Sequence, residues 1–260
     1  LKHGPDSIAA FIAEPMMGSS GGVVPPVKEY WPKIREICTR YNVLLIADEV
    51  MTGMGRTGKP FAIEHWGVTP DMILVGKGIA SGYAPLGAVI AAGHVVEAIA
   101  RGSGAFLHGF TYNAHPVAVA AGNAVLDYIE SEKLFERVPT LGNELREALD
   151  PLKRFSVIGD IRGLGLLLGI EFVSDAKTRA PFPADARVAV RIQQDAFEAG
   201  VITYPIQGCV DGLRGDHILL APPFTFTTGM IHMLVSALER AIGELERTHL
   251  AGAGGTSALV

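Results

Sequence analysis

Lys77 is the residue whose surroundings most strongly suggest chemistry. It lies between Gly76 and Gly78, directly after the apolar run 72–75. A lysine is seldom buried without a partner, and flanking glycines let a bulky group approach the backbone. A reaction that needs such a lysine is imine formation between its amine and an aldehyde cofactor. The alternative is a lysine at a strand end that extends its amine to water, and this segment alone leaves both open.

Two further ionisable residues occupy similar positions. Glu14, Asp48 and Lys77 each follow a short, continuous apolar run. Such runs, when separated by helical stretches, predict strands of a largely parallel sheet that is covered on both faces. In these sheets ligands bind beyond the carboxyl ends of the strands. Three ionisable groups at three strand ends therefore predict a functional site at that edge.

The elements that would position these residues follow from hydrophobic periodicity. In the first half we expect strands at 8–13, 42–47, 72–75 and 87–92 and helices at 30–41 and 116–130. Pro139 should break or kink a helix at 134–149, and Arg162-Gly163 should form a turn. Further on we expect strands at 156–158, 164–173, 201–205 and 217–221, a helix at 184–199, and a final helix capped by Thr227 or Thr228.

The change of pattern predicts two domains. Residues 1–132 would form a large α/β domain, and residues 133–250 a smaller C-terminal α+β domain. The tail 251–260 is rich in glycine and alanine and is expected to be disordered.

Composition excludes several functional classes. The chain has 260 residues, of which 48% are hydrophobic and 19% charged, as in globular proteins with a sizeable core. A formal net charge of −5 leaves no electrostatic footprint for nucleic acid, and no apolar run is long enough to predict a membrane span. Cys38 and Cys209 are too few for a disulfide framework or a zinc cluster. We therefore expect a cytoplasmic protein without a metal site.

One segment imitates a nucleotide-binding motif. Residues 53–60, Gly-Met-Gly-Arg-Thr-Gly-Lys-Pro, nearly match the phosphate-binding loop of ATPases. Pro60 stands where that loop needs a hydroxyl for magnesium, and it is poorly placed inside the helix that should follow. The acidic strand end at Asp48 also precedes the loop, which reverses the usual order. An ATPase is therefore disfavoured.

Several motifs together resemble the class III aminotransferases, which are pyridoxal 5'-phosphate (PLP) enzymes of fold type I. The matching segments, in order, are Ala13-Glu14-Pro15, residues 47–58 (Ala-Asp-Glu-Val-Met-Thr-Gly-Met-Gly-Arg-Thr-Gly), Pro70-Asp71, Gly76-Lys77-Gly78, Thr111-Tyr112-Asn113-Ala114-His115-Pro116, residues 159–165 and Pro222-Pro223-Phe224-Thr225. The resemblance implies the latter part of the large domain, a mainly parallel sheet with helices on both faces, plus a small α+β domain.

The resemblance also implies residue roles. Lys77 would form the Schiff base with PLP, and Asp48 would pair with the pyridine nitrogen. Val50 would pack on the ring, and Glu14 would lie near the ring and the substrate. Thr111 would bind the cofactor phosphate, commonly from the partner subunit, which implies a homodimer with a shared active site. Asp48 or Thr111 could instead cap a following helix, Val50 could be core, and Glu14 could be solvated.

Residues 210–223 resemble the ω-amine:pyruvate transaminase branch, in which a mobile arginine binds the keto-acid carboxylate. Arg214 is the nearest match, and an ordinary exposed loop arginine is the alternative. The substrates would be an amine or amino acid and a keto acid such as pyruvate. Arg162 belongs to another matching motif, where a turn or a structural ion pair competes with a catalytic role.

The chain departs from the family at its start. It opens at Leu1 without a signal peptide and lacks the family's N-terminal part, which carries the Gly-Ser-rich phosphate loop and the aromatic residue that stacks on the ring. We therefore expect a fragment that binds PLP weakly and is possibly inactive alone. A PLP-dependent aminomutase, or a non-catalytic remnant or subunit of an aminotransferase, are the alternatives.

Overall fold

The computed structural model of the chain describes residues 4–255. It divides into two compact units. The first comprises Leu1–Met16 and Pro26–Glu136, and the second comprises Met17–Pro25 and Arg137–Val260. Among the described residues, no helix combines the length and the apolar character needed to cross a membrane.

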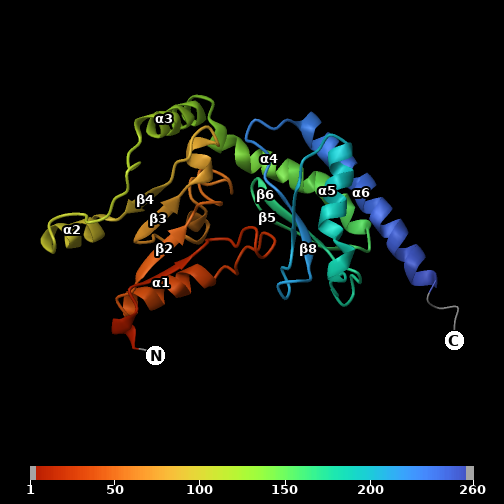
Figure 1. Cartoon of the computed structure of the whole chain (residues 1–260), viewed down its shortest axis with the longest axis horizontal. Helices are drawn as coiled ribbons and strands as arrows, with labels where there is room; N and C mark the ends of the chain where they lie inside the picture. Colours follow the sequence, from red (N-terminus) through yellow and green to blue (C-terminus); the bar gives the residue numbers. More distant parts are fainter. Residues whose placement is uncertain (1–3, 256–260) are drawn as a thin grey trace. The chain divides into compact units, whose positions relative to one another are not determined.

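The first unit is built on a four-stranded sheet in the order β1-β2-β3-β4 (Figure 1). Its strands are β1 (Ala10–Ala13), β2 (Leu44–Asp48), β3 (Met72–Val75) and β4 (Ala88–Ala91). The first three are parallel, and β4 is antiparallel to β3. The mainly parallel α/β sheet expected from the continuous apolar runs is therefore confirmed.

Helices of this unit are α1 (Tyr30–Arg40), α2 (Gly93–Arg101) and α3 (Pro116–Ser131), with short 3-10 helices η1 (Pro5–Ser7), η2 (Ala62–Trp66) and η3 (Lys77–Ala80). Trp31 of α1 is fully buried and packs in a core with Leu45 and Ala47 of β2. Its indole N–H donates to the Pro15 carbonyl at 2.7 Å. This contact ties α1 to the end of β1, next to Glu14.

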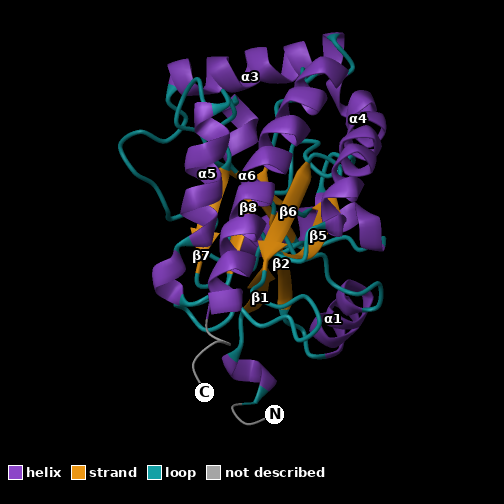
Figure 2. Ribbon diagram, turned by 90° about the vertical axis from the view of Figure 1, so that its right-hand side faces the viewer, coloured by secondary structure: helices purple, strands orange, loops and turns teal. Residues whose placement is uncertain are grey.

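The second unit contains an antiparallel sheet in the order β5-β6-β8-β7. Its elements are β5 (Ile158–Leu164), β6 (Leu167–Phe172), β7 (Tyr204–Gln207), β8 (Asp216–Leu220), η4 (Asp150–Arg154), η5 (Ala184–Ala186), α5 (Val188–Glu198) and α6 (Thr228–Gly255). The helix α4 (Leu134–Leu149) begins in the first unit and continues into the second. Helices α4, α5 and α6 bury one face of the sheet in the main hydrophobic core (Figure 2).

Several sequence predictions for the second half were wrong. Arg162-Gly163 lies inside β5, and the tight turn comes after it, between Leu164 and Leu167. In the sequence, the polar residues of β5 look like turn residues. In the structure they lie on a sheet face that carries ion pairs, where Arg162 Nη1 pairs with Glu171 of β6. No strand covers 156–157. The turn prediction failed because cross-strand pairing compensates polar residues that look like turn signals in isolation.

Two helix predictions also need correction. Pro139 does not break α4, since the helix continues through it and Val138 and Leu145 are fully buried in the core; a kink at Pro139 stays a prediction. Helix α6 runs to Gly255, so residues 251–255 of the expected disordered tail are helical. The rest of that tail lies outside the described residues.

Candidate active site

Three of the candidate residues share one edge of the first unit's sheet. Asp48 is the last residue of β2 and lies opposite Leu74 of β3, three residues before Lys77. In the neighbouring pair Ala13 lies opposite Ala47, which places Glu14 next to Asp48 in register. Because β1, β2 and β3 are parallel, Glu14, Asp48 and Lys77 all lie at the carboxyl edge.

Asp48 is half-buried, and its carboxylate is held close to its own backbone. Its Oδ1 accepts a hydrogen bond from the N–H of Val50 at 3.1 Å. The chain continues from Asp48 into turns rather than into a helix, so the alternative that Asp48 caps a helix is wrong. The local bond closes a tight turn and leaves Oδ2 without a hydrogen bond from that turn.

Val50 packs against the backbone just before Lys77. A Cβ atom added to Gly76 would lie 3.4 Å from Cγ1 of Val50, and one added to Gly78 would lie 3.1 Å from Cβ of Met54. The two glycines that flank Lys77 therefore admit side chains from the segment after β2. Two of the bulky groups that approach this backbone are therefore the side chains of Val50 and Met54.

Lys77 has an unusual backbone conformation. Its φ is +43°, in the left-handed region that non-glycine residues rarely adopt and that costs energy. The preceding Gly76 is buried and extended, and Lys77 begins η3. Lys77 itself is exposed, which agrees with the alternative of an amine that extends to water and leaves both interpretations open. The positive φ of Lys77 favours a functional role, because strained residues cluster at functional sites.

Glu49 is a buried carboxylate whose role the sequence analysis missed. It is 1% exposed, and it accepts hydrogen bonds from the Ile63 N–H at 2.8 Å and from the Thr52 hydroxyl. Its own N–H donates to the Leu74 carbonyl of β3 at 2.9 Å. Burial raises the pKa of Glu49, and these hydrogen bonds oppose that rise. Glu49 thus holds in place the segment that carries Val50 and Met54. The sequence signal for this role was Thr52, whose hydroxyl lies three residues after Glu49 and donates to its carboxylate.

The glycine-rich segment 53–60 does not form a phosphate-binding loop. It is a series of turns followed by the 3-10 helix η2, whereas a phosphate-binding loop leads into an α-helix. Lys59 Nζ donates to the Glu64 carbonyl at 3.3 Å. Burial lowers the pKa of Arg56 in this segment to about 10. The geometry therefore gives no support to an ATPase.

Thr111 lies in the exposed connection before α3. The residue that caps α3 is His115, whose Nδ1 accepts from the Ala118 N–H at 3.4 Å, so the alternative that Thr111 caps this helix is wrong. Helix α3 packs against η3. A Cβ on Gly122 of α3 would lie 3.5 Å from the Ile79 carbonyl oxygen of η3 and 2.6 Å from Leu86 Cδ2. The helix that follows Thr111 thus packs on the segment that begins with Lys77.

Arg214 belongs to the second unit, in the connection between β7 and β8. Its Nε donates to Asp211 Oδ2 at 2.7 Å, and its N–H donates to Oδ1 at 2.7 Å. Hydrogen bonds from the Arg214 N–H and side chain lower the pKa of Asp211 to about 2. Arg214 is exposed and paired locally. Its assignment to a substrate carboxylate stays a prediction.

Arg162 is a structural residue of the second unit. Its Nη1 pairs with Glu171 and lies 3.5 Å from Asp160 Oδ2, while Nη2 donates to the Gly21 carbonyl at 3.2 Å. The segment Met17–Pro25 is therefore held on the polar face of the second sheet. Of the three interpretations left open for Arg162, a turn, a structural ion pair and a catalytic role, the structural ion pair is the one observed.

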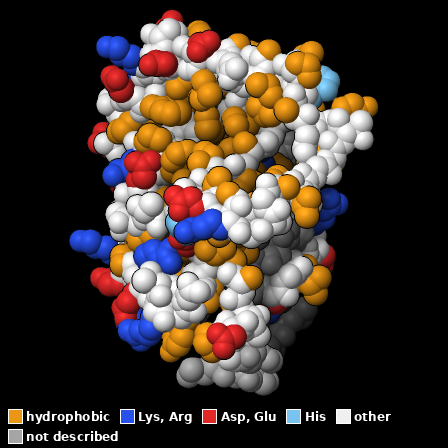
Figure 3. Space-filling model, turned by 90° about the vertical axis from the view of Figure 1, so that its left-hand side faces the viewer, with side chains coloured by type: hydrophobic (Ala, Val, Ile, Leu, Met, Phe, Trp, Pro, Cys, Tyr) orange, Lys and Arg blue, Asp and Glu red, His pale blue; other side chains and the backbone are white. Residues whose placement is uncertain are grey.

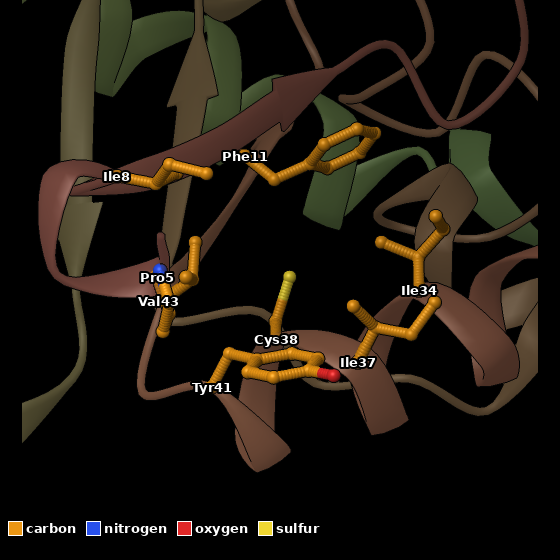
Figure 4. A pocket seen from close by; sticks show the side chains of 8 residues that line it. All are labelled: Pro5, Ile8, Phe11, Ile34, Ile37, Cys38, Tyr41 and Val43. Atoms are coloured by element: carbon orange, nitrogen blue, oxygen red, sulfur yellow. The ribbon is translucent and has the colours of Figure 1, made fainter. Parts of the chain in front are cut away.

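An apolar pocket of about 220 Å³ lies elsewhere in the first unit. Ile8, Phe11, Ile34, Cys38 and Tyr41 are among the side chains that line it, between β1 and α1 (Figure 4). Ile8 precedes β1 and Val43 precedes β2, so the pocket lies at the amino ends of these strands, opposite the Lys77 edge. Burial raises the pKa of Cys38. Within residues 4–255 no cluster of side chains could hold a metal ion.

Comparison with known proteins decides the family. The model of the family described as Aminotransferase class-III matches residues 1–242. This chain belongs to the class III aminotransferases. It is 40% identical over 245 residues to Uncharacterized aminotransferase YodT of Bacillus subtilis, covering 94% of this chain and 55% of that protein. It is 36% identical over 252 residues to Putrescine–pyruvate aminotransferase of Pseudomonas aeruginosa, covering 96% and 53%.

Solved transaminase structures agree with the fold. The PLP-bound amine transaminase from an uncultivated Pseudomonas species is 42% identical, with a TM-score of 0.86, covering 94% of this chain and 54% of that one. A transaminase from the marine bacterium Virgibacillus is 38% identical, with a TM-score of 0.89, covering 95% and 55%. The resemblance to class III aminotransferases and the fold class are therefore confirmed. This chain spans about half the length of the relatives it matches.

The residues at the Lys77 edge fit the cofactor that class III aminotransferases use, PLP. The donor set is an amine on Lys77, a carboxylate on Asp48 and the apolar side chain of Val50, all at the carboxyl edge of β2 and β3. An amine, an anion and an apolar surface match an aldehyde, a protonated pyridine ring and the face of that ring.

Proposed function

We propose that this chain carries the lysine-bearing part of a PLP-dependent aminotransferase site, with Lys77 as the residue that bonds the cofactor. The amino group would pass between an ω-amino compound or amino acid and a keto acid such as pyruvate. The observation that carries the proposal is the pairing of β2 with β3, which brings Asp48 and Lys77 to the same sheet edge.

PLP, when bound, supplies an electron sink for the substrate carbon that loses its proton. The Asp48 carboxylate holds the positive charge on the pyridine nitrogen through a charge-assisted hydrogen bond. Val50 orients the ring by packing on one face. The Lys77 amine then moves the proton at the substrate carbon, as a general base and acid. Glu14, half-buried at the end of β1 beside Asp48, borders the same space and limits which substrate groups enter it.

Names of relatives support the substrate class. They include two γ-aminobutyrate transaminases of rice, a diaminobutyrate–2-oxoglutarate transaminase of Halomonas elongata and the putrescine–pyruvate enzyme. Each of these names specifies a donor with a terminal amino group, and two also specify a keto acid as acceptor. An ω-amino donor and a keto-acid acceptor are therefore the substrates we propose, with Arg214 as the group for the acceptor carboxylate.

Thr111 is proposed to bind the cofactor phosphate, and a homodimer with a shared site is proposed with it. Support comes from the exposure of Thr111 and from α3, which packs on the segment after Lys77. A second candidate function is a non-catalytic aminotransferase subunit. The observation in its favour is that Arg214, the group proposed for the acceptor carboxylate, is already paired with Asp211 at 2.7 Å.

The test is to label the lysine that carries PLP. The 260-residue chain is mixed with PLP, reduced with borohydride and digested with trypsin. We expect the label on Lys77, which blocks cleavage there and converts the peptide 57–77 into 57–101. Lys77→Ala should lose the label, and Lys28→Ala, which changes an exposed lysine of the same unit, should retain it.

Label spread equally over other lysines would refute the assignment. A second assay, which measures alanine formed from pyruvate and γ-aminobutyrate, then distinguishes an aminotransferase from a non-catalytic subunit. Label at Lys77 with amino transfer supports the aminotransferase, whereas label without any transfer supports the non-catalytic subunit. An aminomutase would return the amino group to its own substrate and form no alanine, so a rearranged product would identify it.

A further inference from the structure

The two sheets differ in how their faces are covered. Figure 3 shows hydrophobic side chains exposed on one side of the molecule, and in the first unit Val89 and Ile90 of β4 are 62% and 48% exposed. Successive side chains of a strand point to opposite faces, so both faces of β4 lie open. In the second unit, α4, α5 and α6 bury one face of the sheet, and the segment Met17–Pro25 lies on the other. We call this segment the strap.

The backbone of the strap touches β6. A Cβ atom added to Gly169 of β6 would lie 2.5 Å from the Gly22 carbonyl oxygen. One added to Gly22 would lie 2.7 Å from Arg162 Nη2 and 3.0 Å from His217 Cγ. The neighbours of Gly169 along β6 belong to the helix-covered core, so Gly169 faces the strap. The strap backbone, the guanidinium and the imidazole are therefore in direct contact.

Two side chains of the sheet hold the strap by its carbonyl groups. Arg162 Nη2 donates to the Gly21 carbonyl at 3.2 Å, and His217 Nε2 lies 3.0 Å from the Ser19 carbonyl oxygen. A carbonyl only accepts, so Nε2 carries the imidazole proton and Nδ1 carries the lone pair. His217 is fully buried, and within the described part of the chain its Nδ1 has no hydrogen-bond partner. The geometry therefore fits a neutral imidazole.

The strap is strained where it is held. Val23 is fully buried and has a φ of +60°, which is rare for a β-branched residue. Such a conformation persists only where the surrounding structure imposes it. The strap should therefore relax once its contacts with the sheet weaken.

Protonation of His217 would add a charge that this site accommodates poorly. Burial lowers the pKa of His217, and the Arg162 guanidinium lowers it further, whereas the bond to Ser19 and the charge of Glu171 oppose this. Glu171 lies opposite His217 in the sheet, but its carboxylate already pairs with Arg162. A proton on Nδ1 would thus place a second cation beside Arg162.

The other groups near His217 do not compensate that charge. Asp160 of β5 is within 3.5 Å of Arg162 and belongs to the same ion-pair network as Glu171. Cys209, just after β7, stays neutral because burial raises its pKa. Ile206 of β7 lies opposite His217 and is apolar, and the strap has no titratable side chain.

We propose that His217 is a pH-sensitive latch for the strap. The neutral imidazole holds the Ser19 carbonyl and keeps the strap on the sheet. When Nδ1 takes up a proton from solvent in mild acid, the imidazolium leaves this face and the strap opens. Met17 follows Glu14 by three residues, so the latch sets how firmly the chain beyond Glu14 is held. The inference rests on the second unit and uses neither Lys77 nor PLP.

Hydrogen exchange in the 260-residue chain tests the latch. The Val23 and Val24 amides donate to the Gly18 and Met17 carbonyls at 2.9 and 3.0 Å, so their protection reports whether the strap is closed. In the open strap His217 regains its ordinary pKa of 6.5, so the open population should rise by up to about tenfold per pH unit below that value. Between pH 7.5 and pH 5.5, protection relative to an unstructured peptide should fall at least about threefold.

Two variants identify the titrating group. His217→Gln keeps an N–H for the Ser19 carbonyl but does not titrate, so its strap protection should be the same at both pH values. His249→Gln is the matched control, because His249 Nε2 also lies 3.0 Å from a backbone carbonyl oxygen, that of Ser174, in the same unit. This variant should keep the pH dependence of the native chain.

Constant protection of the native strap over this pH range would overturn the proposal, as would an equal pH dependence in His217→Gln. If His217→Gln does not fold, an NMR titration of the native chain decides: a His217 pKa at or above 6.5 contradicts the latch, and a lower one supports it. Borohydride labelling of Lys77 is independent of each of these results, so the latch and the proposed function fail separately.

Discussion

Removal of the Glu49 carboxylate should loosen the segment that carries Val50 and Met54. In Glu49→Ala the Ile63 N–H and the Thr52 hydroxyl lose their acceptor in a site that is 1% exposed. A buried donor without a partner costs about 1–3 kcal/mol. Two such donors lower the free energy of unfolding by about 2–6 kcal/mol. At about 2–4 °C per kcal/mol for a chain of this size, the Tm should fall by at least about 4 °C.

Glu49→Gln should be much milder, because an amide oxygen can still accept from Ile63. The pH dependence separates it from the native chain. Burial raises the pKa of Glu49 in the folded chain above its ordinary value of 4.5. Between pH 4.5 and this raised pKa, the folded chain therefore binds more protons than the unfolded chain. The contribution of Glu49 to stability is therefore complete below about 4.5 and is lost as the pH rises through the folded pKa. Relative to Glu49→Gln, the native chain should become less stable over that rise.

Thermal unfolding and amide exchange at Ile63 measure both effects. Glu97→Ala is the matched control, since Glu97 is an exposed glutamate of the same unit, paired only with Arg101. Surface pairs contribute about 0–1 kcal/mol, so this change should shift the Tm little. Equal Tm values for Glu49→Ala and Glu97→Ala, with Ile63 still protected, would refute the reasoning.

Two further predictions concern the first unit. Burial works to raise the pKa of Asp71, but hydrogen bonds from Arg35 and from a backbone N–H hold that pKa below 3.8. The contribution of Asp71 to the free energy of unfolding is therefore present above pH 3.8 and is lost as the pH falls through the folded pKa. Asp71→Asn should lower the free energy of unfolding, measured with urea at pH 7, by about 1–3 kcal/mol. If the difference in stability between the native chain and Asp71→Asn did not narrow in acid, this prediction would be contradicted. Gly55→Ala should lower the free energy of unfolding more than Gly67→Ala. Both glycines have positive φ, but only at Gly55 would the added Cβ meet a neighbour, 2.2 Å from the Phe135 ring. Overpacking of this kind adds about 1–3 kcal/mol to the loss of stability. Equal losses in the two glycine variants would show that Phe135 moves aside freely.

Strand positions in the first half were predictable because buried parallel strands are continuous apolar runs. Met72–Val75 was predicted with its observed bounds, and α1 within one residue. The second half was harder, since β5 carries Arg162 and Asp160 among its apolar residues. Their partners lie on other strands or in Met17–Pro25, at sequence separations that local patterns do not report.

The sequence by itself determined the order of the motifs, the strand ends at which Glu14, Asp48 and Lys77 lie, and the family to which they point. These are local properties, set by the apolar runs and by the residues that follow them. Only the tertiary structure decided that Glu49 is buried, that Lys77 is exposed with a strained backbone, and that β4 runs antiparallel with both faces open. Burial and backbone strain depend on segments distant along the chain, such as Ile63 against Glu49, and no local pattern contains those contacts.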